Sequence, residues 1–213
     1  MTPVQSDKGA IGVLLRKMIA AGQISDPASP KGRLLAAAAK LFREKGYSRT
    51  TVRDLAAEVG ILSGSIFHHF ANKDEILFGV MREVVSAMNA SLAESLSHEH
   101  SPRDKVRALI HHELTFVLGT PGNASAVLVF EWRALSEDRQ AEILKQREVY
   151  DQLWLETLEE ARAAGLTHME SDVLRQLLHG AIAWTLNWYD PEGPLTMDDL
   201  IERTMSLAVS KPA

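Results

Sequence analysis

Small polar residues gather in one short stretch of this 213-residue chain, the run Leu-Ser-Gly-Ser-Ile over residues 62–66. The hydroxyls of Ser63 and Ser65 can hydrogen-bond phosphate oxygens or base edges. Gly64 lets its backbone come close to a partner because it has no side chain. These residues stand at the expected start of a helix, and the positive end of a helix favours anions. The pattern predicts a surface that binds nucleic acid.

Aromatic residues and histidines complete the stretch. Ile66 and Phe70 lie four residues apart, so on a helix they share the face that anchors it inward. His68 lies off that face and is the better candidate for a contact, whereas His69 is expected to pack or to cap. Phe67 is either a core residue or a contact.

The elements before this stretch must hold it in place. Thr51 and Asp54 resemble a capping box that begins a helix, and Gly60 can take the left-handed conformation that ends it. Ser63 is expected to cap the next helix, which runs to about Phe70. Two short helices joined by a tight turn predict a helix-turn-helix, whose second helix enters the major groove of DNA.

Helical periodicity covers almost the whole chain, and no run alternates as a strand would. We expect an all-α fold of about nine core helices. The predicted domains are an extension over 1–29, a three-helix DNA-binding head over 30–75, and a helical-bundle body over 76–213 that binds a ligand and dimerises. Within the extension, apolar residues from Ile11 to Ile19 favour a short helix or a mobile arm. In the body, Pro and Gly breaks leave helices near 103–118, 124–135, 138–164, 171–188 and 196–209.

The charge distribution fits a head that meets phosphate. The whole chain has a net charge of −5, with 23 Lys and Arg against 28 Asp and Glu. Residues 30–75 nevertheless hold eight Lys and Arg against five Asp and Glu, a net charge of +3. A solvated basic face without a partner would have the same composition, so the charge favours DNA binding without requiring it.

The run from Leu55 to Leu77 closely resembles the DNA-binding signature of TetR-family repressors, and the match covers residues 30–78. It includes the aromatic-His-His-Phe block and the Asn-Lys-Asp that follows it. The resemblance implies that DNA is contacted by Leu62, Ser63, Gly64, Ser65, Phe67 and His68 in the recognition helix, by Thr50 and Thr51 before the second helix, by Lys73, and by Lys31 and Arg33 near the minor groove.

The body concentrates aromatic and polar residues that would suit an apolar pocket with a few polar handles. Each of them is either a core residue or a ligand contact. The candidates for ligand binding are His111, Phe116, Phe130, Trp132, Arg133, Trp154, Trp184, Asn187 and Trp188. The segment around Trp188 and Trp132 resembles the TetR-family subgroup that controls fatty-acid, steroid or aromatic-acid breakdown, which implies an acyl-CoA effector. A drug-like or other apolar ligand is the alternative.

The last two helices carry apolar faces that suggest a homodimer, and TetR-like repressors dimerise through the same two helices. The expected faces are Leu174, Leu177, Leu178, Ala181 and Ile182, followed by Leu200, Ile201, Met205 and Ala208. Two-fold symmetry would place the two recognition helices about one DNA turn apart, so the expected partner is a near-palindromic double-stranded operator.

Other classes of function have less support. The chain has no cysteine, which excludes disulfides and thiolate sites. His111 and His112 are adjacent, so their rings diverge on a helix and do not readily share a metal. We expect no metal, no cofactor and no enzymatic activity, although His111, His112 and Glu113 leave a helical hydrolase as one alternative and a protein-binding adaptor as another. No apolar run approaches a membrane span and no signal peptide is evident, so we expect a cytoplasmic protein without a membrane partner.

Overall fold

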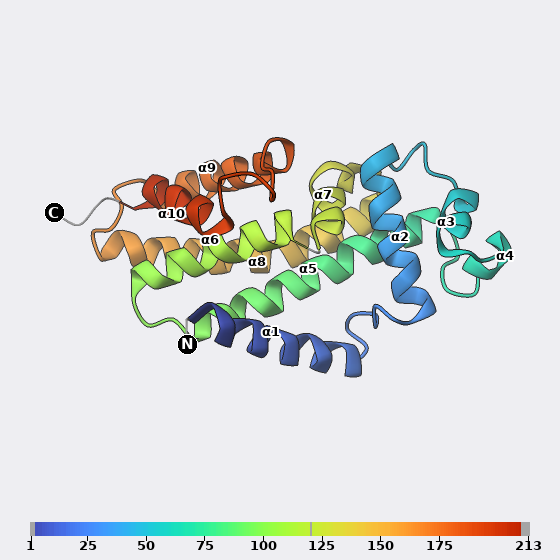
Figure 1. The fold of residues 1–213 in the computed structure, drawn as a ribbon, viewed down its shortest axis with the longest axis horizontal. Helices are drawn as coiled ribbons and strands as arrows, with labels where there is room; N and C mark the ends of the chain where they lie inside the picture. The colour runs from blue at the N-terminus through green and yellow to red at the C-terminus, as the bar shows by residue number, and fades with distance from the viewer. Residues whose placement is uncertain (1–2, 120, 210–213) are drawn as a thin grey trace. The chain divides into compact units, whose positions relative to one another are not determined.

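The computed structural model describes residues 3–119 and 121–209, and these residues form helices joined by loops, with no strand among them. The all-α prediction is therefore confirmed (Figure 1). The α-helices are α1 (Pro3–Ala20), α2 (Pro30–Lys45), α3 (Val52–Val59), α4 (Ser63–Ile66), α5 (Lys73–Ser97), α6 (Pro102–Leu118), α7 (Gly122–Phe130), α8 (Glu137–Ala163), α9 (Ser171–Trp184) and α10 (Met197–Ala208). Single 3₁₀ turns, η1 (Trp132–Ala134) and η2 (Thr185–Asn187), follow α7 and α9.

The N-terminal extension contains helix α1, so of the two alternatives the structure has the helix. Met18 is buried, which accounts for part of the apolar pattern in this segment. Gly22, with φ +69°, lies in the turn that follows α1.

The chain divides into two compact units. One contains Gly12–Asn89 and Pro121–Arg147; the other contains the described parts of Met1–Ile11, Ala90–Thr120 and Glu148–Ala213. The long helices α5 and α8 each contribute residues to both units. The two compact units do not meet at residue 75, where the sequence analysis placed the limit between head and body. The predicted domain limits stay a prediction.

The first unit holds the helix-turn-helix, and local capping defines its helices. Ser29 caps α2 by accepting a hydrogen bond from the Gly32 N–H, with Pro30 as the first helical residue. Gly46, with φ +82°, ends this helix. Helix α2 packs on α3 and on α7, and α3 packs on α4 (Figure 1).

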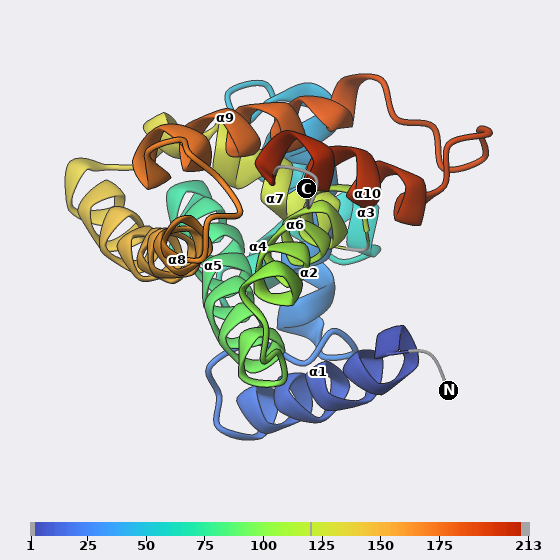
Figure 2. The same ribbon diagram turned by 90° about the vertical axis from the view of Figure 1, so that its left-hand side faces the viewer.

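The second unit is a bundle in which α6, α9 and α10 pack on one another (Figure 2). Ser101 and Thr196 cap α6 and α10 through their side-chain oxygens. The predicted limits of these helices agree with the structure to within a few residues, except that the predicted last turn of α9 is the 3₁₀ turn η2.

Three local predictions are wrong. The recognition helix ends at Ile66 rather than near Phe70, because the N–H groups of residues 67–69 donate to carbonyls three residues back and tighten the chain into turns. Its N-cap is Leu62 rather than Ser63. The predicted helix over 124–135 is also divided: α7 stops at Phe130, and Glu131 leaves helical geometry before η1.

Among the described residues, helix α5 is long and apolar enough, by length and composition, to cross a membrane. The expectation that no apolar run approaches a membrane span is therefore not met by α5. Half of the apolar window in α5 is buried inside the structure.

Candidate nucleic-acid interface and ligand site

The recognition segment is fixed from beneath by apolar anchors. Ile66 is completely buried and Phe70 nearly so. Gly60 adopts the left-handed conformation, with φ +74°, and its N–H donates to the carbonyls of Ala56 and Ala57. This turn places α4 directly after α3, as a helix-turn-helix requires.

Side chains around α4 that do not anchor it point to solvent. Leu62 is 81% exposed and Phe67 is 55% exposed, and His68 is exposed as well. Ser63 and Ser65 are half-buried, whereas Gly64 is exposed. The structure therefore presents all six residues that were predicted to contact DNA in this segment. His69, which was expected to pack or cap, is also exposed.

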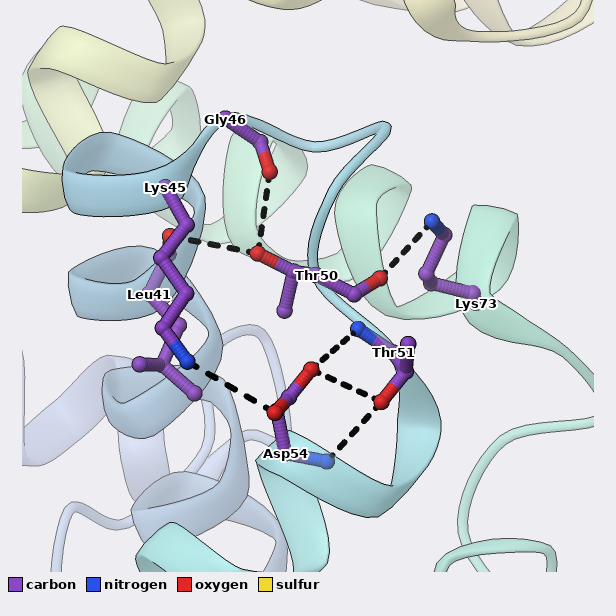
Figure 3. A network of polar contacts seen from close by, with 7 residues as sticks. All are labelled: Leu41, Lys45, Gly46, Thr50, Thr51, Asp54 and Lys73. Atoms are coloured by element: carbon purple, nitrogen blue, oxygen red, sulfur yellow. Dashed lines mark hydrogen bonds and ion pairs between the residues drawn. The ribbon is translucent and has the colours of Figure 1, made fainter.

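The N-terminus of α3 already holds a carboxylate (Figure 3). The Thr51 N–H and hydroxyl both donate to Asp54 Oδ2, at 2.8 and 2.7 Å, and the Asp54 N–H donates back to the hydroxyl. These hydrogen bonds from Thr51, with a smaller effect from Lys45 at 3.5 Å, lower the pKa of the Asp54 carboxyl. Thr51 is thus engaged in the capping box that the sequence predicted, and a phosphate would meet Asp54 at the same helix end.

Thr50 is fully buried, so its predicted phosphate contact is wrong. Its hydroxyl is shared between the carbonyls of Leu41 and Gly46, at 3.2 and 2.9 Å (Figure 3). The backbone of the loop before α3 requires this donor, and the side chain therefore faces inward.

Lys73 also has an internal role that the sequence did not suggest. Its ammonium donates to the carbonyls of Tyr47 and Thr50, at 2.8 and 2.9 Å, and lies 4.2 Å from the centre of the Tyr47 ring. A lysine in a first helical turn opposes the helix dipole, and these two carbonyls offset that cost. Lys73 therefore connects α5 to the loop that precedes α3 (Figure 3).

The predicted cations Lys31 and Arg33 also make internal contacts. Lys31 lies 3.9 Å from Glu83, and Arg33 donates to the Ala28 carbonyl at 2.6 Å. Arg53, in the first turn of α3, is exposed and was missed by the sequence analysis. Its position in the helix that supports α4 was the signal that could have identified it as a phosphate contact.

In the second unit, a buried ionic cluster joins three helices. Glu113 of α6 and Arg175 of α9 are almost completely buried, with 3.6 Å between Oε2 and Nη1. His179 Nδ1 donates to the other Glu113 oxygen at 2.6 Å, and Arg175 Nη2 donates to Asp151 of α8 at 3.0 Å. Burial acts to raise the pKa of the Glu113 carboxyl, but Arg175 and His179 together outweigh it and hold that pKa below its ordinary value.

Several polar atoms of this cluster have no hydrogen-bond partner. They are Arg175 Nε and Nη1 and Glu113 Oε2, of which Nη1 and Oε2 face each other as an ion pair at 3.6 Å. The Arg175 guanidinium lies 4.5 Å from the centre of the ring of the fully buried Trp154. Buried polar groups are nearly always hydrogen-bonded, so the Arg175 donors indicate a place for a further polar group.

His112, next to Glu113 on α6, makes a separate buried contact set. Its Nε2 lies 2.7 Å from the Ser91 hydroxyl, its Nδ1 lies 3.2 Å from the Tyr150 hydroxyl, and its ring stacks on Phe116 at 4.7 Å. Burial lowers the pKa of His112 to about 3, so the ring is neutral. These buried partners of His112 were not predicted from the sequence.

The predicted ligand residues do not form one lining. Trp154 and Phe116 are buried and His111 is half-buried, whereas Trp184, Asn187 and Trp188 are exposed. Phe130, Trp132 and Arg133 belong to the other unit, where Phe130 is 63% exposed and Arg133 lies 5.1 Å from the Trp132 ring centre. The structure thus brings only Trp154 into the buried ionic cluster.

The predicted dimer faces also need correction. Seven of the nine residues are buried within the protomer: Leu174, Leu178, Ile182, Leu200, Ile201, Met205 and Ala208. Helix α9 has a second apolar face that remains exposed, formed by Val173, Leu177, Ala181 and Trp184, and α10 adds the exposed Leu207. We call these five residues the α9 face.

A shallow hollow of about 800 Å³ lies along α8 and the start of α9. Its lining is acidic, with Glu156, Glu159, Glu160, Glu170 and Asp172, and includes none of the predicted ligand residues. This is not the apolar pocket that the sequence predicted. Within the described residues, no three His, Cys, Asp or Glu side chains are grouped to hold a metal ion.

Sequence profiles match both parts of the chain. A profile described as "Bacterial regulatory proteins, tetR family" matches residues 34–80, and one described as "Tetracyclin repressor-like, C-terminal domain" matches residues 99–211. The second match alone covers more than half of the chain.

Individual relatives extend these matches. The chain is 27% identical over 190 residues to the HTH-type transcriptional repressor KstR2 of Mycolicibacterium smegmatis, covering 87% of this chain and 91% of the relative. The KstR2 structure from Mycobacterium tuberculosis, a ketosteroid transcriptional regulator, has a TM-score of 0.79 at 24% identity and covers 89% of this chain and 100% of that one.

Two other solved structures are similar. One, described as superantigen pfit, has a TM-score of 0.81 at 44% identity and covers 94% of this chain and 100% of that one. The other is AibR in complex with isovaleryl coenzyme A and operator DNA, with a TM-score of 0.77 at 21% identity, covering 84% of this chain and 97% of that one. At that identity the likeness to AibR shows the fold alone.

Proposed function

Because this chain belongs to the tetR family of bacterial regulatory proteins, we propose that it is a cytoplasmic transcriptional repressor that an effector releases from its operator. It binds a near-palindromic operator as a homodimer and catalyses no reaction. The observation that carries this function is the recognition segment, in which Leu62, Ser63, Gly64, Ser65, Phe67 and His68 all reach solvent while Ile66 and Phe70 are buried.

We propose different roles for the residues around the recognition segment: some contact base edges, some contact phosphates and some position the helices. The α4 residues contact base edges and nearby phosphates, and the exposed Arg53 contacts phosphate. Lys31 and Arg33 are available for the neighbouring minor groove, because the Lys31 side chain is 39% exposed and Arg33 is exposed. Thr51 and Lys73 act by positioning α3.

Dimerisation uses the α9 face. It combines Trp184, 65% exposed, with Leu177, 57% exposed, and Leu207, 68% exposed, on two adjacent helices. Several large apolar side chains exposed on adjacent helices favour a protein interface, and two-fold symmetry makes one face self-complementary. The occupant is a second copy of this chain.

Leu177→Asp therefore should yield monomers that no longer bind the operator. Leu144→Asp is the matched control, since Leu144 is also an exposed helical leucine but lies outside the α9 face. Light scattering of both variants at micromolar concentration checks this, and a dimeric Leu177→Asp protein would refute the interface.

We place the effector's polar group at the buried ionic cluster. An acyl-CoA offers a thioester carbonyl that can accept hydrogen bonds from Arg175 Nε and Nη1, which have no hydrogen-bond acceptor in the protein. Leaving a buried donor unpaired costs about 1–3 kcal/mol. A ligand that satisfies these donors is thereby favoured, and release of DNA follows if it binds the DNA-free state more tightly.

The experiment is a salt-dependent binding titration on DNA from the gene's own upstream region, repeated with acyl-CoA thioesters and with their free acids. Specific binding that falls with salt and is reversed by a thioester supports the whole proposal. If apolar compounds that lack coenzyme A release the DNA and the thioesters do not, the effector is not an acyl-CoA but another apolar ligand. Absence of any specific DNA binding would refute the repressor function.

The relative described as a superantigen suggests a second candidate function, because it is 44% identical to this chain. A T-cell proliferation assay with the purified protein tests it directly. Stimulation without specific DNA binding would favour this function over the repressor.

A further inference from the structure

Leu62 occupies a position where the fold gains nothing from a leucine. It is the N-cap of α4, with φ −72° and ψ 141°, and makes no side-chain capping hydrogen bond. At 81% it is also the most exposed of the large apolar side chains that the structure describes. Serine, threonine, asparagine or aspartate at an N-cap stabilises a helix by about 1 kcal/mol relative to an apolar residue.

The same protein uses capping elsewhere. Four other helices, α2, α3, α6 and α10, each begin after a serine or threonine whose side-chain oxygen accepts a backbone hydrogen bond. Helices α7 and α9 also begin without a side-chain cap, but their N-cap residues are Pro121 and Glu170, whereas the recognition helix begins at a leucine that is exposed to solvent.

Gly64 is a second sign of the same kind. Its backbone is not in the left-handed region, and a methyl group added there would meet nothing within 4 Å apart from its chain neighbours and the backbone of its own helix. Glycine inside a helix costs about 0.5–1 kcal/mol relative to alanine. The stability and packing of the described chain therefore explain neither Leu62 nor Gly64. In contrast, packing does explain Ile66, which is fully buried.

Both features are explained if α4 lies against the floor of the major groove. The 5-methyl group of thymine is the distinctive apolar feature of base edges in that groove. We propose that Leu62 reads a thymine by packing on this methyl group, and that Gly64 allows the backbone to come close enough for the contact. This inference rests on the proposed function and names its specificity.

The test begins with selection of the operator from a random-sequence DNA library by the wild-type protein. Each thymine of the selected site is then replaced by deoxyuridine, which removes only the methyl group. Wild-type protein should lose affinity about fourfold for each half-site at one symmetric thymine position, the value expected for one buried methyl group. Leu62→Ser should bind more weakly and should no longer distinguish thymine from deoxyuridine.

Stability separates this contact from a structural role. Leu62→Ser supplies a cap, so its melting temperature should equal or exceed that of wild type while its affinity falls. Leu62→Ala tests the contact if the serine variant does not fold. Leu144→Ser, which removes an exposed leucine outside the interface, is the matched control and should keep the sensitivity to deoxyuridine.

Each outcome decides between defined alternatives. If no sequence is selected, the proposed function fails. If an operator is selected but wild type tolerates deoxyuridine at every position, only the thymine contact is overturned. If Leu62→Ser weakens binding equally on all sequences, Leu62 packs on the sugar-phosphate backbone and the inference is wrong.

Discussion

Replacing Arg175 by methionine should lower the free energy of unfolding by about 3–5 kcal/mol, because it leaves the Glu113 carboxylate buried without its main counter-charge. Glu113 is 2% exposed and keeps only the hydrogen bond from His179 on its other oxygen. Asp151, the second partner of Arg175, is 48% exposed and can be rehydrated, so most of the loss falls on Glu113.

A double-mutant cycle tests this origin of the loss. Glu113→Gln alone leaves Arg175 bonded to Asp151 but removes the closest buried charge. In the double variant neither buried charge remains, so its destabilisation should be smaller than the sum of the two single losses. The expected coupling is about 1–3 kcal/mol, the range measured for residues in direct contact.

The assay is urea unfolding followed by circular dichroism near neutral pH, with the protomer concentration held constant because the proposed dimerisation would contribute to stability. Arg162→Met is the control: Arg162 pairs with Glu159 at 2.7 Å on the surface, and its loss should change stability by less than about 1 kcal/mol. Single losses that add to within about 0.5 kcal/mol would show that Arg175 and Glu113 do not interact, and would refute the reasoning.

Three further predictions concern the buried histidine, the cations of the head and the caps. The pKa of His112 is about 3 in the folded protein and 6.5 in the unfolded chain, so between these pH values only the unfolded chain is protonated. Lowering the pH within this range should therefore reduce the free energy of unfolding by up to about 1.4 kcal/mol per pH unit, and urea unfolding at several pH values should show a weaker pH dependence of stability for His112→Gln. Lys73→Met should weaken operator binding without changing the slope of log affinity against log salt concentration, whereas Arg53→Met should reduce that slope by about one. A reduced slope for Lys73→Met would show instead that Lys73 contacts phosphate. Thr51→Ala and Thr196→Ala should each lower stability by about 1 kcal/mol in thermal unfolding, but only the former should reduce operator affinity, and equal effects on DNA would contradict the assigned role of α3.

Features that depend on local interactions could be predicted from the sequence of this protein. The capping box of Thr51 and Asp54 closes within three residues, and the turn at Gly60 depends on one backbone conformation. Such features require no knowledge of distant contacts, so both were predicted correctly. The resemblance to the TetR family rests on the same stretch and is confirmed by the profile matches.

The helical period of the apolar residues identified the apolar faces of the helices, but it did not identify the elements that pack on them. Helix α9 has one apolar face with Leu178 and Ile182, which is buried in the protomer, and another with Leu177 and Trp184, which is exposed. Both faces follow the 3.6-residue period, and only the packing of α6 and α10 against α9 decides which is internal.

Long-range polar contacts were likewise decided by the tertiary structure. Lys73 reaches carbonyls 26 and 23 residues earlier in the chain, and His179 reaches Glu113 across 66 residues. A side chain of either type is equally compatible with solvent, with DNA or with a ligand until the backbone around it is placed. The sequence by itself therefore determined the all-helical fold, the capping box of α3 and the position of the recognition segment, whereas packing determined which polar groups are used internally and which remain for a partner.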